Sequence, residues 1–203
     1  MKELIVATRN RGKIHEITAL LAGLVDQVSS AADFADFPET IEDGVTFEDN
    51  ALKKAREAAR FTGLPALADD SGLAVDALDG CPGVFSARFA GEHAGDAANN
   101  ALLLEKCHNI PEGQRQAAFV CVVAFVTPDG EEQLFTGRIS GQILSSARGE
   151  GGFGYDPLFL VDGFDRSMAE LTLAEKNGVS HRAQAIGKFL EYLRATELVK
   201  NVV

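Results

Sequence analysis

The sequence predicts an α/β fold in which strands and helices alternate around one hydrophobic core. Short runs of β-favouring residues, such as Leu4–Ala7, are separated by segments whose apolar residues recur at helical spacing. Hydrophobic residues make up 46% of the 203 residues, and a chain of this length buries a core without disulfides or metal ions. No repeat, low-complexity tract or change of composition marks a linker, so we expect a single domain over residues 1–203.

The first 40 residues predict a βαβ unit followed by a loop. After the strand Leu4–Ala7 come a polar stretch over residues 8–13 and a helical pattern between Ile14 and Leu21. Residues 24–28 can form a second strand. Residues 31–39 are acidic and include Pro38, a pattern that is typical of a loop.

The next segment predicts a capped helix and a strand that ends at an acidic pair. Thr46-Phe47-Glu48-Asp49 resembles a capping box with Asp in place of Glu, and alanines follow at helical spacing until Gly63-Leu64-Pro65. We therefore expect a helix over residues 46–61. A short strand over residues 66–68 then runs into Asp69-Asp70-Ser71-Gly72, and residues 73–75 can resume extended structure. On this reading the two carboxylates lie at a strand end.

The second half of the chain predicts a turn, two helices and a hairpin. Gly80-Cys81-Pro82-Gly83 is typical of a turn, and residues 96–106 have helical periodicity. Residues 117–126 and 133–139 predict two strands joined at Thr127-Pro128-Asp129-Gly130. A glycine-dense stretch over residues 149–156 precedes a last helical pattern over residues 180–193.

Composition excludes several classes of function. The net charge of −11 argues against a surface that binds nucleic acid or anionic lipid, because both need a basic face. The longest apolar run, over residues 117–126, is about half of the roughly 20 residues that a membrane-spanning helix needs. Three widely spaced cysteines fit neither a disulfide framework nor a zinc site. The first residues lack the features of a signal peptide, so we expect a cytoplasmic protein.

Two segments have the chemistry for phosphate and for a hard cation. Thr8-Arg9-Asn10-Arg11-Gly12-Lys13 lies at a strand-to-helix junction, where free N–H groups, the helix dipole and a lysine favour an anion. It lacks the two glycines of a Walker loop, and an ordinary surface helix start is the alternative. Asp70, beside Asp69, can present oxygens to Mg²⁺ with Glu42 as a second carboxylate. An acidic pair of this kind is also common in solvated turns.

Two further segments could bind a flat base and charged groups. Phe153 and Tyr155 lie in the glycine-dense stretch, where the backbone can approach a ligand and aromatic rings can stack on it; a flexible loop is the alternative. Lys176, His181 and Arg182 lie around a helix start and can bind phosphate or base edges, although structural hydrogen bonding is the commoner role for such residues.

Six segments, taken together and in this order, resemble the inosine triphosphate pyrophosphatase family, also called Ham1-like proteins. These segments are Thr8–Lys13, Thr46-Phe47 with Asn50-Ala51, Ala68–Leu73, Gly83 with Ser86-Ala87-Arg88, Gly152–Pro157 and Ser180-His181-Arg182. The resemblance covers nearly the whole chain. It implies an α/β fold with a central mixed, twisted sheet and flanking helices, two lobes that enclose a nucleotide cleft, and a homodimer.

The resemblance also implies an activity. Members of the family hydrolyse non-canonical purine nucleotides, such as inosine, deoxyinosine and xanthosine triphosphates (ITP, dITP and XTP), to the monophosphate and pyrophosphate, with Mg²⁺ as the cofactor. This chain departs from the family pattern at two places. Arg9 replaces a small residue, and Asn177-Gly178 matches the corresponding family segment only loosely.

Roles for individual residues follow from the same resemblance. Glu42 and Asp70 are implied to hold the metal, Asp70 to act as general base and Lys53 to assist the phosphates, with Glu39 or Asp43 as alternatives to Glu42. Phe153 is implied to stack on the base, and His181 and Arg182 are candidates for contacting the 6-oxo group. The residues implied to bind substrate are Thr8, Arg9, Asn10, Arg11, Gly12, Lys13, Ser71, Phe153, Gly154, Tyr155, Asp156, Lys176, His181 and Arg182.

Other functions remain open on the residues themselves. A Maf-like pyrophosphatase for modified pyrimidine nucleotides would release the same inorganic product and differ in base preference. A nucleotide-binding module that does not hydrolyse its ligand would need the phosphate loop but not Asp70. A solvated ion pair between Asp49 and Lys53, four residues apart on one helix, is the alternative to a role for Lys53 in catalysis.

Overall fold

The computed structural model describes residues 1–196, which lie in two compact units. The first unit comprises Met1–Asp70, Cys121–Gly137 and the chain from Arg182 onward, and the second comprises Ser71–Val120 and Arg138–His181. Each unit is therefore built from segments that are distant in the sequence. The prediction of one domain over residues 1–203 stays a prediction, as does the nucleotide cleft expected between two lobes.

The strands form a mixed sheet, as the resemblance implied. In the described part of the chain they are β1 (Glu3–Val6), β2 (Gln27–Ser30), β3 (Ala66–Val75), β4 (Gln116–Val126), β5 (Glu132–Ile143) and β6 (Phe159–Val161), in the order β2-β1-β3-β4-β5-β6. β1 pairs in parallel with β2 and β3, whereas β5 and β6 are antiparallel. The opening βαβ unit and the long hairpin of β4 and β5 are confirmed.

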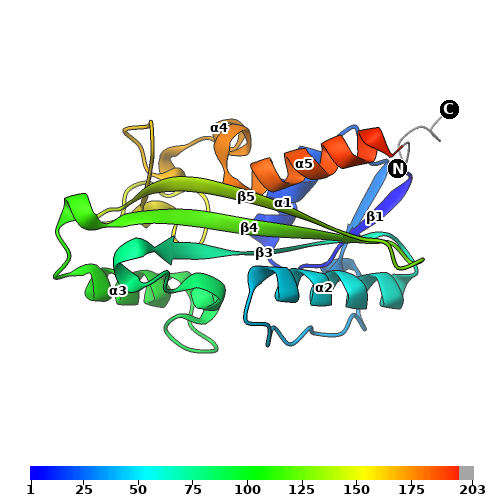
Figure 1. Ribbon diagram of the computed structural model, residues 1–203, viewed down its shortest axis with the longest axis horizontal. Coiled ribbons are helices and arrows are strands. Elements are labelled where there is room, and N and C mark those ends of the chain that lie inside the picture. The colour runs from blue at the N-terminus through cyan, green and yellow to red at the C-terminus, as the bar shows by residue number, and fades with distance from the viewer. Residues whose placement is uncertain (197–203) are drawn as a thin grey trace. The chain divides into compact units, whose positions relative to one another are not determined.

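The helices of the described residues are α1 (Arg11–Leu21), α2 (Phe47–Thr62), α3 (Asp96–Cys107), α4 (Leu173–Val179) and α5 (His181–Ala195). In the first unit, α1 and α5 cover one face of the sheet and α2 covers the other (Figure 1). No helix within residues 1–196 combines the length and the apolar character needed to cross a membrane.

The core of the first unit follows the alternation of side chains along its strands. Leu4 and Val6 pack in one cluster with Ile17 of α1 and Phe189 of α5. Ile5, between them in sequence, packs in a second cluster with the alanines of α2. Because neighbouring residues of a strand point to opposite faces, a continuous apolar run fills both sides of the sheet.

The second unit has a core of its own. Phe119 of β4 and Phe159 of β6 pack with a ring-centroid distance of 4.5 Å. They belong to a cluster that also contains Leu103 of α3 and Met168. The second unit therefore has a hydrophobic interior built only from its own residues.

Several elements differ from the sequence expectation. β3 runs without interruption from Ala66 to Val75, so Asp69 and Asp70 lie inside a strand and not at its end. Neither α4 nor β6 was expected, and β5 extends to Ile143. The final helix starts at His181, close to its predicted start, while residues 197–203 lie outside the described part.

Candidate active site

The polar loop after β1 caps the first helix. Asn10 is the N-cap of α1: its Oδ1 accepts a hydrogen bond from the backbone N–H of Lys13 at 3.1 Å, and its own N–H donates to Thr8 Oγ1 at 3.2 Å. A helix start leaves N–H groups that point outward and favour an anion. The expected strand-to-helix junction is confirmed. Arg9 instead donates to the carbonyl of Phe37 at 2.6 Å, which ties the loop to a neighbouring segment.

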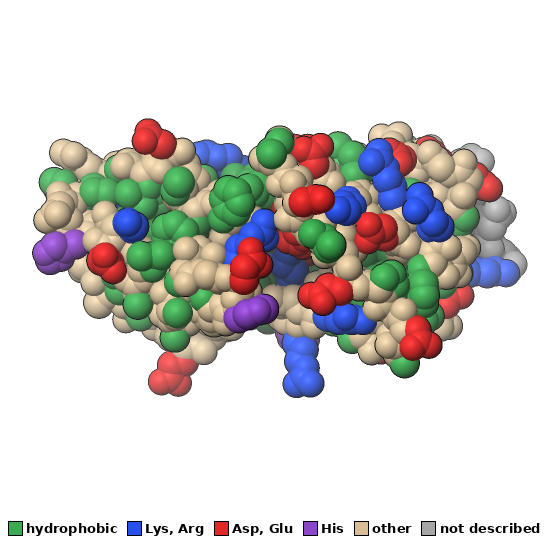
Figure 2. Space-filling model, turned by 90° about the horizontal axis from the view of Figure 1, so that it is seen from below, with side chains coloured by type: hydrophobic (Ala, Val, Ile, Leu, Met, Phe, Trp, Pro, Cys, Tyr) green, Lys and Arg blue, Asp and Glu red, His purple; other side chains and the backbone are tan. Residues whose placement is uncertain are grey.

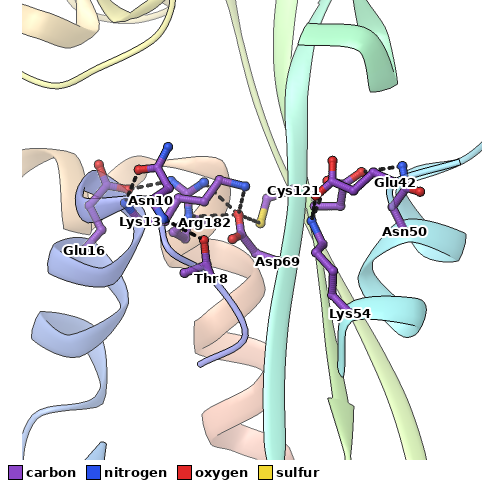
Figure 3. A network of polar contacts seen from close by, with 11 residues as sticks. Thr8, Asn10, Lys13, Glu16, Glu42, Asn50, Lys54, Asp69, Cys121 and Arg182 are labelled. Carbon is purple, nitrogen blue, oxygen red and sulfur yellow. Dashed lines mark hydrogen bonds and ion pairs between the residues drawn. The ribbon is translucent and has the colours of Figure 1, made fainter. Parts of the chain in front are cut away.

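Asp69 and Asp70 face opposite sides of β3. Figure 3 shows Lys13, Glu16 and Arg182 on the side of the strand that Asp69 faces, and Asn50 and Lys54 on the other side. This arrangement follows from the strand itself, in which successive side chains alternate. The acidic pair is therefore two separate sites, each with its own cations.

Asp69 belongs to a buried ion-pair network. Its Oδ2 lies 2.8 Å from Arg182 Nη2 and 3.1 Å from Lys13 Nζ, and Arg182 Nη1 lies 2.5 Å from Glu16 Oε2. Burial opposes ionisation of Asp69, but the positive charges of Lys13 and Arg182 outweigh it and hold its pKa well below the usual range. Asp69 is thus a permanent anion that fixes two cations, and it is unsuited to accept a proton near neutral pH.

Asp70 shares a lysine with Glu42. Lys54 Nζ lies 2.8 Å from Asp70 Oδ1 and 2.7 Å from Glu42 Oε1, and Asp70 Oδ2 accepts a hydrogen bond from Asn50 Nδ2 at 3.2 Å. Burial raises the pKa of Asp70 and prevails over the attraction of Lys54. The pKa of Lys54 is raised because the charges of Asp70 and Glu42 outweigh its own burial. Burial, with the nearby charge of Glu42, thus favours proton uptake by Asp70 against the opposing charge of Lys54.

The two carboxylates fit a magnesium ion better than a transition metal. Glu42 and Asp70 each place an oxygen within 2.8 Å of one ammonium group, so they already converge on a single cation. Among residues 1–196 there is no cluster of three or more His, Cys, Asp or Glu side chains that could hold a metal. Magnesium is commonly bound by one or two carboxylates together with water and substrate phosphates, which matches this donor set.

The structure brings Lys54, and not Lys53, to this carboxylate pair. Lys53 Nζ instead pairs with the exposed Asp43 at 2.7 Å. Sequence reasoning missed Lys54, although a signal was present: Lys54 follows Ala51 by three positions and therefore lies on the apolar side of the helix, where it is buried. Asn50, one residue before Ala51, is also buried. Sequence reasoning did not identify it as a residue of the site.

The glycine-dense stretch of the second unit is organised by a buried ion pair. Lys176 Nζ lies 2.5 Å from Asp156 Oδ2 and 4.9 Å from the centre of the Phe153 ring. The same carboxylate oxygen accepts the backbone N–H of Phe153 at 2.9 Å. A Cβ on Gly152, whose φ is +72°, would come within 2.1 Å of Asp156 Oδ2, so only glycine fits there. The pair thus fixes the loop that presents Phe153, which is partly exposed.

The remaining predicted residues of the second unit have different surroundings. Tyr155 is buried, and its hydroxyl donates to the carbonyl of Ser86 at 2.8 Å, so its ring packs in the core and is not presented to solvent. His181 is also buried and stacks on Phe119 with a centroid distance of 4.9 Å. The N–H of Gly154 donates to Asp96 Oδ2 at 2.7 Å, and Ser71 follows Asp70 on β3.

These features define a class: an α/β protein with a helix start suited to phosphate and a lysine-bridged carboxylate pair suited to magnesium. On the surface that Figure 2 shows, basic side chains are interspersed with acidic ones, so this face has no extended basic patch.

Comparison with known proteins narrows the class. The model of the Ham1 family matches residues 4–192, and the chain belongs to this family. A dITP/XTP pyrophosphatase of Geobacter sulfurreducens is 57% identical over 193 residues, which cover 95% of this chain and 97% of that protein.

Solved structures agree with the family assignment. A Ham1 protein from Coxiella burnetii is 41% identical with a TM-score of 0.86, and the match covers 96% of this chain and 100% of that one. The Staphylococcus aureus Ham1 protein is 40% identical with a TM-score of 0.84 and the same coverage of both chains.

Proposed function

We propose that this protein is a magnesium-dependent nucleoside triphosphate pyrophosphatase that converts ITP, dITP and XTP to the monophosphate and pyrophosphate. Relatives named dITP/XTP pyrophosphatase match nearly the whole chain at 57% and 53% identity, which supports the reaction and the substrate class. The observation that carries the proposal is the convergence of Glu42 and Asp70 on the ammonium group of Lys54 in the first unit.

In the proposed mechanism, a water molecule attacks the α-phosphorus. Its proton passes to Asp70, the bond between the α-phosphorus and the bridging oxygen breaks, and pyrophosphate leaves with the bond's electron pair. Glu42 and Asp70 would hold the magnesium ion, which when bound neutralises charge on the phosphate oxygens. Lys54 holds both carboxylates in place and compensates charge that develops on the phosphates. Asn10 and Lys13, at the start of α1, bind the triphosphate.

Base recognition is assigned to residues that the resemblance implied. Phe153 is presented by a loop that the ion pair of Asp156 and Lys176 fixes, and it is proposed to stack on the purine. His181 and Arg182 remain the candidates for a hydrogen bond to the 6-oxo group. A site built to donate to a carbonyl rejects adenine, because the exocyclic amine leaves the donor unpaired.

Pyrophosphate release from ITP and from adenosine triphosphate, at equal concentration, tests the proposed function. We expect release from ITP to be much faster with Mg²⁺ and to stop with a chelator. Release from modified pyrimidine triphosphates alone would favour a Maf-like activity. Binding of ITP without release would favour a module that does not hydrolyse its ligand.

A pair of variants tests which lysine acts. Lys53→Met and Lys54→Met remove the same charge from adjacent positions of α2, and thermal unfolding reports whether each variant is folded. We expect Lys54→Met to lower kcat by at least about 100-fold, the effect typical of losing one preorganised charge-stabilising donor. We expect Lys53→Met to change kcat much less. A larger loss of kcat in Lys53→Met than in Lys54→Met would instead support the role that the resemblance implied for Lys53.

A further inference from the structure

The segment that carries Glu42 lies along α2 and is held by one side of that helix. Residues 37–44 have no helix or strand of their own. Thr40 hydrogen-bonds to Glu57, Glu42 pairs with Lys54 at 2.7 Å, Asp43 pairs with Lys53 at 2.7 Å, and the N–H of Gly44 donates to Asn50 at 2.8 Å. Positions 50, 53, 54 and 57 follow helical spacing, so the segment runs antiparallel to α2 along one side of it.

Asn50 differs from the other α2 residues that bind this segment, because both the oxygen and the nitrogen of its amide form hydrogen bonds at the candidate site. Its Oδ1 accepts the N–H of Gly44, two residues after Glu42, and its Nδ2 donates to Asp70 Oδ2 at 3.2 Å. The side chain is fully buried. The donor on Gly44 fixes which end of the amide is oxygen, and the nitrogen must then face the carboxylate.

The close approach of Gly44 to Asn50 leaves no room for a side chain at position 44. A Cβ at that position would lie 2.5 Å from Asn50 Oδ1 and 2.8 Å from Asp49 Cβ. The segment therefore lies directly against the amide, and two side chains, Asn50 and Lys54, join it to Asp70.

We propose that Asn50 is a positioning residue for hydrolysis: its amide bridges Gly44 and Asp70 so that Glu42 and the Oδ1 atom of Asp70 face one metal position. The inference rests on the proposed function and adds a residue to it. Asn50 engages Oδ2 of Asp70, while Oδ1 lies 2.8 Å from Lys54 Nζ, the same group that Glu42 contacts at 2.7 Å. Partners that orient ligating carboxylates typically contribute about 10- to 100-fold to activity or metal affinity.

Two substitutions separate the two hydrogen bonds of Asn50. Asn50→Leu has a similar size and removes both bonds. Asn50→Asp keeps an acceptor for Gly44 but loses the donor to Asp70. We expect each variant to lower kcat by about 10- to 100-fold, and to weaken binding of Mn²⁺ to the nucleotide-free protein, measured by electron paramagnetic resonance, by a similar factor. The KM for ITP should change much less than kcat.

The matched control is Asn99→Leu in α3. Asn99 is also buried, accepts the N–H of Ala90 at 2.8 Å and donates to the carbonyl of Ala87 at 3.1 Å, so it bridges backbone groups without touching a carboxylate. We expect Asn99→Leu to lower the melting temperature while kcat and Mn²⁺ affinity stay within about twofold of wild type, because this amide orients no ligand.

Three outcomes would overturn the inference. Asn50→Leu could behave like Asn99→Leu, with lower stability but unchanged kcat and Mn²⁺ affinity. Asn50→Asp could retain wild-type kcat, which would reduce Asn50 to an anchor for the loop. A wild-type protein that binds no Mn²⁺ would overturn the inference together with the metal site. If the wild-type protein does not hydrolyse ITP, the proposed function fails, but the inference on Asn50 can still be tested. Mn²⁺ binding reports the effect of the Asn50 variants without the reaction.

Discussion

Asp69 and Asp70 are neighbours in sequence, yet their surroundings give them opposite properties. Asp69 faces Lys13 and Arg182, which keep it ionised in a fully buried position. Asp70 faces one lysine that it shares with Glu42, and burial raises its pKa. Of these two buried carboxylates, Asp70 is the one whose pKa is raised, and this agrees with the role of base that the resemblance implied for it.

The ion pairs of Asp69 predict a large loss of stability when its charge is removed. Asp69→Asn leaves Arg182 buried with less compensation, and breaking a buried pair in this way costs about 3–5 kcal/mol. Urea unfolding measures the change in the free energy of unfolding. The matched control is Asp43→Asn, which breaks an exposed ion pair with Lys53. The urea midpoint of this variant should change little, because exposed ion pairs contribute little to stability. Equal losses in the two variants would contradict the structural role of Asp69.

Sequence reasoning could find the motifs of the site but not every residue that completes it. Asn10 and Lys13 lie at a junction that the local pattern reveals. Lys53 and Lys54 are adjacent and chemically identical, so only their position around the helix distinguishes them. The partner that buries Lys54 is Asp70, 16 residues away, and a local pattern contains no information about it.

At the scale of elements, long and strongly periodic segments were predictable and short ones were not. α2, α5 and the hairpin of β4 and β5 have their own capping, periodicity or turn signals. β6 has only three residues and α4 only seven, so both are too short for a clear periodicity, although Thr172 and Glu175 form a capping box at the start of α4. β3 was predicted to stop at its acidic pair because the cations that compensate the pair come from distant segments, such as Arg182, 113 residues away.

The start of α2 gives a prediction at this scale. Thr46 is the N-cap, and its hydroxyl oxygen accepts the N–H of Asp49 at 3.1 Å. Thr46→Ala should lower the free energy of unfolding by about 1 kcal/mol. The control is Thr18→Ala, at an exposed position inside α1, where alanine should stabilise by a few tenths of a kcal/mol. Chemical denaturation measures both, and effects of the same sign would count against the capping role.

The start of α4 gives a prediction about pH. Hydrogen bonds from Arg166 and from the backbone of Thr172 lower the pKa of Glu175 from 4.5 to about 2. Because the folded pKa lies below the unfolded one, the carboxylate stabilises the fold above pH 4.5, and this contribution disappears as the pH falls from 4.5 through 2. The difference in stability between wild type and Glu175→Gln should therefore shrink over that interval. An NMR titration of the Glu175 carboxyl near its ordinary pKa would contradict the prediction.

At the scale of the whole molecule, the two compact units share three strands. β3, β4 and β5 each have residues in both units, and each unit has its own hydrophobic cluster. Continuous strands couple the stability of the segments they connect. The homodimer implied by the resemblance and the cytoplasmic location stay predictions, and light scattering of the full chain tests the first.

The shared strands predict a single unfolding transition. The chain contains two tyrosines and no tryptophan, and Tyr155 lies in the second unit while Tyr192 lies in the first. Tyr192→Phe and Tyr155→Phe each leave one fluorophore that reports on one unit. In each variant, the fluorescence midpoint in urea should coincide with the midpoint of far-ultraviolet circular dichroism. Separate midpoints would show that the units unfold independently.

The chain passes between the two units after Asp70, Val120, Gly137 and His181. Two of these points fall inside motifs of the candidate site, between Asp70 and Ser71 and between His181 and Arg182. A genetic crossover at any single one of these points would therefore always divide the first unit between the two parents. The first unit, which holds Glu42, Lys54 and Asp70, thus cannot be exchanged as a module by one crossover, and new properties of these residues would arise by point substitution.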